Sequence, residues 1–280
     1  MALAVSRASS DRQAKIIELL RQSGRVTVED LAGQFGVTLQ TIRRDLNDLS
    51  EAHRVVRVHG GAIVASGVEN LAYEARQLVA RPHKQLIGQA AARLIPNNSS
   101  LFINIGTTTE EVARALTAHT GLLVITNNLH VANELYRNKA IEIFLTGGTM
   151  RHGDGGIVGA ATVSQIEQFR VDMAIIGTSA IDSTGTLLDF DIREVETSRA
   201  IIGHARKIVL VSDSSKFSRS APVKIAHLSE IDTFITDRLP SKAVAGMCRE
   251  CDVEVIEVGG PSEPEPAGAG LRTEAEAEAT

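Results

Sequence analysis

A run of small and hydroxyl-bearing residues follows an apolar, strand-like segment near the middle of the chain. The segment is Leu101–Ile105, and Gly106, Thr107, Thr108 and Thr109 come directly after it. A glycine turn that leads into a helix presents free backbone N–H groups and the positive end of the helix dipole, and threonine hydroxyls add further donors. The run therefore favours a phosphate group. A threonine N-cap after a glycine turn is also common where no ligand binds, so the run alone leaves both interpretations open.

Other polar residues stand just after predicted strands. These residues are Asn127, Asn128, Gly148 and Lys216. In open parallel sheets the carboxyl ends of the strands form the ligand-binding edge, so we expect these groups to gather near the threonine run. A lysine at that edge can neutralise a phosphate, although a lysine in a surface loop would have the same sequence. Asp182 and the pair Glu194 and Glu196 flank the strand that ends at Ile176.

A second candidate site lies near the N-terminus, where a predicted helix begins after Thr38. Its apolar residues recur with helical spacing and are expected to pack inward: Leu39, Ile42, Leu46 and Leu49. A basic hairpin with a glycine-rich turn follows over residues 55–62. A helix of this kind followed by such a hairpin predicts a winged helix-turn-helix that binds double-stranded DNA. The candidate DNA-binding residues are Thr38, Gln40, Thr41, Arg43, Arg44, Arg54, Arg57 and His59.

The arginines of the predicted recognition helix have two possible roles. Arg43 and Arg44 can contact guanine or phosphate, or they can pair with Asp45 or Asp48 on a solvated helix face. The net charge of the chain is −5, but residues 1–60 carry nine Lys and Arg against seven Asp and Glu, so the acidic excess lies elsewhere. Aromatic residues make up only 3% of the chain, which argues against single-strand binding by base stacking.

The elements that would position the threonine run form an alternating pattern. Apolar strand-like runs alternate with helical stretches from residue 84 onward, which predicts an α/β domain with a mostly parallel sheet covered on both faces. The strands are expected at Leu101–Ile105, Leu122–Ile125, Ile141–Leu145, Val171–Ile176, Ile208–Ser212, Thr233–Ile235 and Val253–Val258. The expected organisation is a winged helix-turn-helix over 1–62, a linker over 63–83 with a helix near 73–79, the α/β domain over 84–260 and a disordered acidic tail over 261–280.

Composition excludes several classes of protein. The apolar fraction is 43% and the charged fraction 22%, as in ordinary globular proteins, and no apolar run approaches the length that spans a bilayer. No signal peptide is evident, so we expect a cytoplasmic protein without a membrane partner. Cys248 and Cys251 form a Cys-x-x-Cys pair, but no second pair completes a zinc site, and we interpret them as ordinary thiols. No metal or cofactor is expected.

Taken together, these segments resemble the DeoR family of bacterial transcription regulators. The N-terminal resemblance lies in the run Thr41 to Leu46 and in His59 to Ala62, and the C-terminal resemblance lies in Gly106 to Thr108, Gly147-Gly148 and Asp213 to Phe217. The resemblance implies a ligand-sensing domain similar to ribose-5-phosphate isomerase. In such a domain Gly106 to Thr109 would hold phosphate, while Asp182, Glu194 or Glu196, and Lys216 would occupy positions like those of the isomerase's site groups.

Within the family, several segments look like the branch that responds to sn-glycerol-3-phosphate, among them residues 126–129, 154–159 and 187–191. The resemblance therefore implies a repressor whose operator binding is controlled by this metabolite. It also implies a homo-oligomer, either a dimer or a tetramer. Two alternatives stay open: the same regulator with another phosphorylated effector such as a ketose phosphate, or a sugar-phosphate isomerase with a DNA-binding appendage, which the fused DNA reader makes the less economical interpretation.

Overall fold

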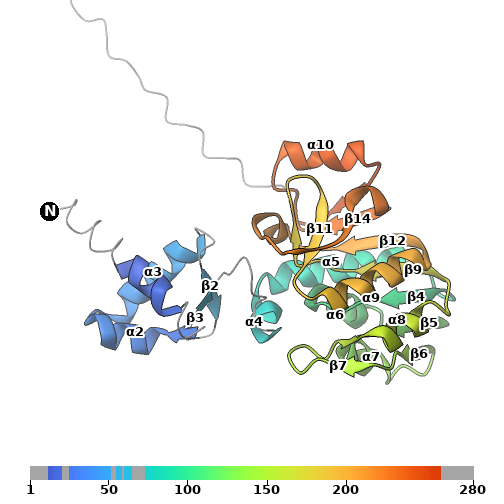
Figure 1. The fold of residues 1–280 in the computed structure, drawn as a ribbon, viewed down its shortest axis with the longest axis horizontal. Coiled ribbons are helices and arrows are strands. Elements are labelled where there is room, and N and C mark those ends of the chain that lie inside the picture. Colours follow the sequence, from blue (N-terminus) through green and yellow to red (C-terminus); the bar gives the residue numbers. More distant parts are fainter. Residues whose placement is uncertain (1–11, 21–24, 52–54, 59, 65–72, 260–280) are drawn as a thin grey trace, which may run out of the picture.

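The computed structural model describes residues 12–20, 25–51, 55–58, 60–64 and 73–259. Figure 1 shows two parts, a small N-terminal part and a larger C-terminal part that begins with helix α4 (Tyr73–Leu78). Arg54, His59 and the tail over 261–280, for which we made predictions, lie outside the described residues.

The N-terminal part is a set of short helices packed on a small sheet. Residues 12–20 are helical and are followed by β1 (Arg25–Thr27), α2 (Val28–Phe35), α3 (Leu39–Glu51), β2 (Val55–Val58) and β3 (Gly61–Val64). The strands pair antiparallel in the order β1-β3-β2. Ile42, Leu46 and Leu49 of α3 are buried as predicted, but Leu39 is 41% exposed because it lies in the first turn, beyond the edge of this core.

The C-terminal part is built on one seven-stranded sheet in the order β15-β14-β12-β9-β4-β5-β6. All of its strand pairs are parallel, which confirms the predicted fold class. Each predicted strand has a counterpart: β4 (Ser100–Ile103), β5 (Leu122–Thr126), β6 (Ile141–Leu145), β9 (Val171–Ile176), β12 (Ala205–Val211), β14 (Thr233–Thr236) and β15 (Glu254–Glu257). β4 and β9 lie at the centre, so their carboxyl ends reach the middle of that edge of the sheet.

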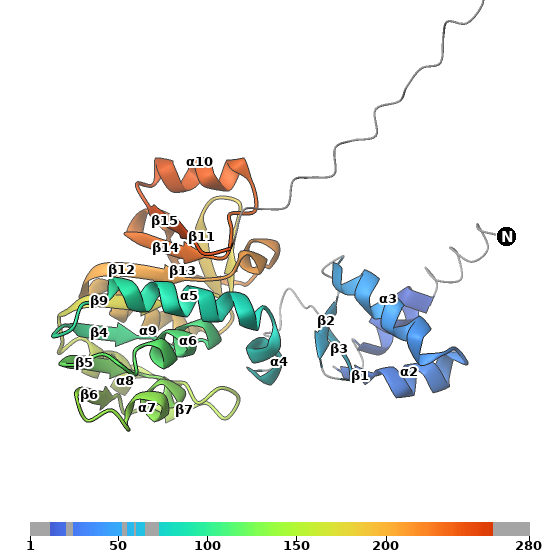
Figure 2. The ribbon, with the colours of Figure 1, turned by 180° about the vertical axis from the view of Figure 1, so that it is seen from behind.

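Helices cover both faces of this sheet. α5 (Arg81–Leu94), α6 (Thr107–Ala115) and α7 (Leu129–Leu135) pack on one face, and α5 is in front in Figure 2. α8 (Ala160–Ile166), α9 (Ile192–Gly203) and α10 (Lys242–Glu250) pack on the other. Alternate residues of β4 pack in the two hydrophobic cores. Leu101 and Ile103 belong to the first core, and Phe102 belongs to the second.

Several short elements were not predicted. An antiparallel sheet is formed by β10 (Ala180–Ile181), β11 (Thr186–Asp189) and β13 (Val223–His227), and a small hairpin by β7 (Thr149–Met150) and β8 (Ile157–Val158). The 3-10 turns η1 (Ser214–Ser218) and η2 (Leu228–Glu230) precede and follow β13. Pro82 occupies the first turn of α5, where a missing N–H costs nothing.

Gly88 allows α5 and α6 to approach closely. A Cβ at Gly88 would lie 2.6 Å from the carbonyl oxygen of Glu111 in α6, so no side chain fits between the two backbones. This contact fixes α6, whose N-terminus carries the threonine run, against α5.

No helix among the residues that the structure describes is long and apolar enough to cross a membrane. Both cysteines are free thiols; Cys248 is buried in the core under α10.

Candidate functional site

A pocket lies at the N-terminus of α6, at the carboxyl ends of the central strands. Its empty volume is about 400 Å³, part of it open to solvent. We call it the α6 pocket, and its lining residues are Arg76, Ile105, Gly106, Thr107, Thr108, Thr109, Gly177, Thr178, Ser179, Asp189, Glu194, Val211 and Lys216. Gly106, the N-cap of α6, has a φ of 151°, which side chains other than hydrogen rarely allow. The predicted threonine run therefore surrounds a real concave site.

Lysine side chains provide the positive wall of the α6 pocket. Lys84 of α5 is 3% exposed, and its Nζ donates to Thr107 Oγ1 at 3.0 Å. Lys216 of η1 lines the pocket, where burial, and then the charges of Arg219, Lys84 and Arg76, lower its pKa to about 7, while Asp213 opposes the shift. Burial, followed by Arg219 and Arg76, likewise lowers the pKa of Lys84 to about 8.

The repulsion among these cations indicates which kind of ligand the pocket favours. Neighbouring positive charges lower one another's pKa, and a bound anion would offset their repulsion. The N-terminus of α6 adds its own positive potential and unpaired N–H groups to the same place. The arrangement is therefore suited to a group of two negative charges, such as a phosphate ester.

Carboxyl groups provide another part of the pocket wall. Glu194, in the first turn of α9, and Asp189, at the end of β11, are both buried and both line the pocket. Burial, and then the charge of Asp189, raise the pKa of Glu194 to about 8, and burial raises that of Asp189 as well. Arg151 Nη1 lies 2.6 Å from Glu194 Oε2 and opposes the shift. At neutral pH this wall can both donate and accept hydrogen bonds, as recognition of hydroxyl groups requires.

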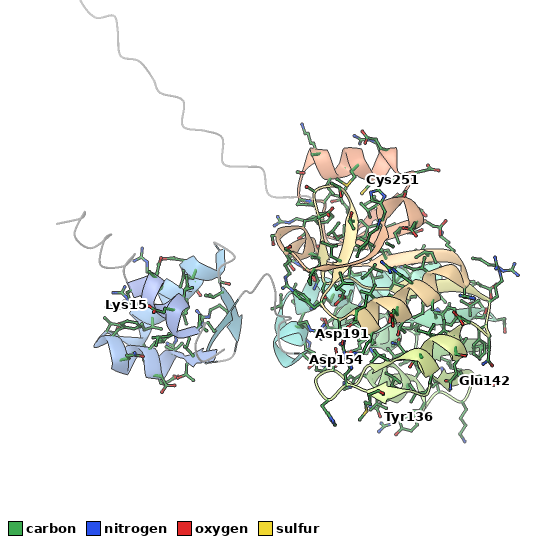
Figure 3. All side chains as sticks on the ribbon, in the orientation of Figure 1. Lys15, Tyr136, Glu142, Asp154, Asp191 and Cys251 are labelled. Carbon is green, nitrogen blue, oxygen red and sulfur yellow. The ribbon has the colours of Figure 1, made fainter. Side chains whose placement is uncertain are left out.

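Arg151 is shared among three carboxylates. Besides Glu194 it pairs with Asp191 at 3.3 Å and with Asp154. Asp154 and Asp191 lie close together in Figure 3, although they come from the loop after β7 and from the N-cap of α9. The pKa of Asp191 is lowered to about 2, chiefly by its hydrogen bond with Arg193. The pocket wall is thus held by an ion-pair network around one arginine.

Helix α4, the first element of the C-terminal part, also contributes to the pocket. Arg76 of α4 lines it, and its Nη2 pairs with Asp154 Oδ2 at 3.0 Å. Tyr73, one turn earlier, donates its hydroxyl to Glu110 Oε2 at 2.8 Å and stacks on His130 with ring centroids 4.9 Å apart. The linker region therefore supplies part of the site.

The other predicted residues lie at the same edge of the sheet but outside the pocket lining. Asn127 donates to the carbonyl of Ile157, and Asn128 is the N-cap of α7. Gly148 is packed against Thr162, and Asp182 binds the hydroxyl of Thr184 and backbone N–H groups within the β10–β11 turn. In the lining, Thr109 donates its hydroxyl to backbone carbonyls of its own turn. The fold therefore places Asp189, rather than Asp182, in the pocket.

Sequence reasoning missed several residues of the site, and the charged ones among them are Arg76, Lys84 and Asp189. Lys84 and Arg76 lie 23 and 31 positions from Thr107 and belong to no local pattern with it. Asp189 stands in the run Leu187 to Asp191, which was read only as a family resemblance. Side chains alternate between the two faces of a strand, so Leu187 and Asp189 share a face and are both buried. This alternation could have predicted that Asp189 is buried.

The candidate DNA-binding residues of α3 lie at one end of the N-terminal part. Thr38 Oγ1 accepts from the backbone N–H of Thr41 at 3.2 Å and so caps α3. Gln40, Arg43 and Arg44 are exposed. No ion pair of Arg43 or Arg44 occurs within the described part of the chain, since Asp45 pairs with Arg12 and Asp48 accepts from Gln13. The described residues therefore show no pairing of these arginines with Asp45 or Asp48.

Arg57 of the hairpin, a candidate DNA-binding residue, makes hydrogen bonds within the protein. Its Nη1 donates to Asn47 Oδ1 at 2.6 Å and to the carbonyl of Arg43 at 3.1 Å. Arg57 thus connects β2 to α3 and fixes the angle between hairpin and helix, while the α3 arginines remain available. Among the residues that the structure describes, no group of His, Cys, Asp and Glu could hold a metal ion.

Comparison with known families and proteins gives consistent matches. Residues 12–68 match the DeoR-like helix-turn-helix domain, and residues 80–238 match the DeoR C terminal sensor domain. The chain is 47% identical to the glycerol-3-phosphate regulon repressor of Escherichia coli (strain K12), over 84% of this chain and 93% of that protein. It is 39% identical to the HTH-type transcriptional repressor CsqR of the same organism, over 88% and 94%.

Among solved structures, the ribose 5 phosphate isomerase A of Neisseria gonorrhoeae matches with a TM-score of 0.36 and 14% identity, over 49% of this chain and 53% of that one.

Proposed function

The chain belongs to the DeoR family of transcriptional repressors, and from this premise we propose that it binds operator DNA through α3 and the β2–β3 hairpin and releases it when sn-glycerol 3-phosphate occupies the α6 pocket. Its similar relatives are named as repressors, so the chain is a regulator rather than an enzyme. We call residues 73–259 the sensor from here on.

The observation that carries the effector proposal is the pairing of a cationic wall with a buried carboxyl wall across one pocket. Lys84, Lys216 and the N-terminus of α6 supply the charge and donors that a phosphate dianion needs. Asp189 and Glu194 supply hydrogen-bonding groups for the hydroxyls at the other end of the ligand. A short polyol phosphate carries these two kinds of group at opposite ends.

The similarity to a repressor named for the glycerol-3-phosphate regulon supports this choice among polyol phosphates. We also propose that Gly106 to Thr109, Glu194 and Lys216 contact the effector. Asn127, Asn128, Gly148 and Asp182, outside the lining, would shape the same edge of the sheet rather than touch the ligand.

For DNA, we propose direct contacts from Thr38, Gln40, Thr41, Arg43 and Arg44, with the hairpin residues Arg54, Arg57 and His59 on or near the adjacent backbone. One winged domain reads one half-site, and two recognition helices must be spaced by about one helical turn of DNA or a multiple of it. We therefore propose a homo-oligomer, a dimer or a tetramer, in which the unit over residues 1–62 is joined by the linker over 63–83 to the sensing domain over 84–260.

The proposal is tested by the thermal stability of the purified full chain with sn-glycerol 3-phosphate, glycerol, inorganic phosphate, and pentose and hexose phosphates. A ligand that binds only the folded state raises the unfolding midpoint through mass action. We expect a shift with sn-glycerol 3-phosphate and none with glycerol. A larger shift with a ketose phosphate would replace the effector but keep the pocket, and no shift with any phosphorylated compound would refute the effector proposal.

Operator release is measured separately by titrating labelled operator DNA with protein, with and without the compound that gives the largest shift. We expect operator affinity to fall by roughly 5- to 150-fold when the effector is saturating, the usual range of coupling between two sites. Unchanged affinity would contradict the proposed control of DNA binding.

A further inference from the structure

Helix α4 is the first element of the sensor, and its side chains contact α6, α7 and the loop after β7. It also lies against β2 of the DNA-binding part. Tyr73 stacks on His130 of α7 and hydrogen-bonds to Glu110 of α6, both sensor residues. Gln77 donates to the Tyr73 hydroxyl at 2.6 Å and keeps that ring in place. Figures 1 and 2 both show α4 against the end of the sensor that faces the DNA-binding part.

Arg76 is the residue through which α4 reaches the pocket. Its backbone carbonyl accepts from Lys84 Nζ and, at 3.5 Å, from Thr107 Oγ1, so it touches two groups of the cationic wall. Its guanidinium lines the pocket, and Nη2 pairs with Asp154 at 3.0 Å. The Nε of Arg76 is buried and has no hydrogen-bond partner within the described part of the protein. A buried donor without a partner beside an anion pocket is costly unless a ligand satisfies it.

We propose that Arg76 binds the phosphate of the effector directly, and that this contact is what transmits occupancy of the pocket to the DNA-binding part. The inference rests on the proposed function, since it assigns the residue and the route by which that same pocket acts.

The physical basis is competition for one guanidinium. Without ligand, Arg76 pairs with Asp154, which Arg151 also binds. A phosphate dianion at the N-terminus of α6 offers a second partner, and the planar guanidinium of arginine can donate two parallel N–H bonds to such an anion. Exchange of partners moves or tightens α4, whose chain continues toward β3. A ligand alters DNA binding only through contacts that differ between two conformations, and Arg76 provides such a contact.

The test compares Arg76→Gln with Lys216→Ala in the full chain, using calorimetric titration with sn-glycerol 3-phosphate and with inorganic phosphate, and operator binding at saturating sn-glycerol 3-phosphate. Both variants should bind the phosphate compounds about tenfold or more weakly, as expected for a lost charge-assisted contact. Lys216→Ala should still release DNA fully once the ligand saturates, because it lies on the sensor alone. Arg76→Gln should bind the ligand at high ligand concentration but should not release operator DNA.

The outcomes separate this inference from the proposed function. If the wild type binds and releases normally and Arg76→Gln does the same, only the role of Arg76 falls. If Arg76→Gln binds weakly but releases DNA fully at saturation, Arg76 is a ligand contact without a transmitting role, and the inference is overturned. If the wild type binds neither compound, both proposals fail together.

A second variant guards against a simple loss of folding in α4. Asp154→Asn keeps the shape of the carboxylate but removes its hold on Arg76, so it should bind sn-glycerol 3-phosphate more tightly than the wild type, by about three- to tenfold. Weaker binding by Asp154→Asn, in line with Arg76→Gln, would mean that the pair only holds the loop after β7 in place, and would overturn the proposal.

Discussion

Lys216 and Lys84 are lysines whose charge the α6 pocket suppresses. Their pKa values fall to about 7 and about 8 from an ordinary 10.5, because burial and neighbouring cations disfavour the charged form. The folded chain therefore binds fewer protons than the unfolded chain between pH 7 and 10.5. The stability of the ligand-free protein should rise with pH across this window, and the charged lysines should cost stability below it.

The first prediction is that effector binding takes up a proton. At pH 8 Lys216 is mostly neutral in the free protein, and a phosphate dianion beside it restores an ordinary pKa, so about one proton should be bound with each ligand. The apparent binding enthalpy should then depend on the ionisation enthalpy of the buffer. Calorimetric titrations in two buffers at pH 8 measure the number of protons.

The control for this prediction is Lys216→Met, which should lower the proton uptake at pH 8. Zero uptake by the wild type at that pH would mean that no depressed lysine contacts the ligand. Affinity should also decline as pH rises above 8, because the protonation must then be driven by binding itself.

The second prediction concerns Arg44, which is exposed on α3. If it reads a base edge, Arg44→Ala should weaken operator binding by about 1–3 kcal/mol and leave binding to random DNA nearly unchanged. Fluorescence titration with operator and scrambled duplexes measures both affinities. Arg93→Ala, which removes an exposed arginine of α5, is the matched control. Equal losses on the two duplexes would make Arg44 a phosphate contact instead.

At the scale of elements, the close approach of α5 and α6 positions the N-terminal end of α6. The third prediction is that Gly88→Ala destabilises the protein by about 1–3 kcal/mol, because its Cβ would lie 2.6 Å from a backbone atom of α6 and the helices must separate. Gly246→Ala in α10 has no heavy atom closer than 4.0 Å and should be neutral or stabilising. Denaturant unfolding of both variants measures the difference.

Separation of α5 from α6 also moves Lys84 away from Thr107. Gly88→Ala should therefore bind phosphate compounds more weakly than Gly246→Ala, measured at a temperature where both are folded. Unaltered affinity and stability in Gly88→Ala would show that the helices yield easily at this crossing.

The elements that could be predicted are those marked by a pattern of neighbouring residues in the sequence. The seven parallel strands are apolar runs bounded by turn residues, so each was found. β10 is two residues long and pairs with a strand whose own partner lies beyond α9, so nothing local marked it. The pocket was predicted only in part, for the same reason. Gly106 to Thr109 are contiguous in the sequence, whereas Arg76 and Lys84 reach Thr107 only through tertiary packing.

At the scale of the whole molecule, the two parts have separate hydrophobic cores. The N-terminal core contains residues 16–62 only, and the two sensor cores contain residues from 87 onward. No buried side chain is shared between these clusters among the described residues. Each part should therefore lose its structure without removing the packing of the other.

The fourth prediction uses this separation. Leu46 is fully buried in the N-terminal core, and Leu46→Ala should cost that part about 2–5 kcal/mol and abolish operator binding, while effector affinity changes less than about twofold. Leu86→Ala, at an exposed leucine of α5, is the control and should preserve both functions. Operator and effector titrations on the two variants provide the measurement. Loss of effector binding in Leu46→Ala would mean that the parts fold as one unit.

The position of α4 limits where the DNA-binding part of one such repressor can be joined to the sensor of another. The match to the sensor domain begins at residue 80, yet Arg76 already lines the pocket and Tyr73 hydrogen-bonds to Glu110 of α6. A chimaera spliced at residue 80 would inherit its binding cavity from one parent and part of that cavity's wall from the other. Evolution by domain shuffling, and the construction of biosensors, should therefore succeed when the splice falls before Tyr73 and the helix travels with the cavity that it completes.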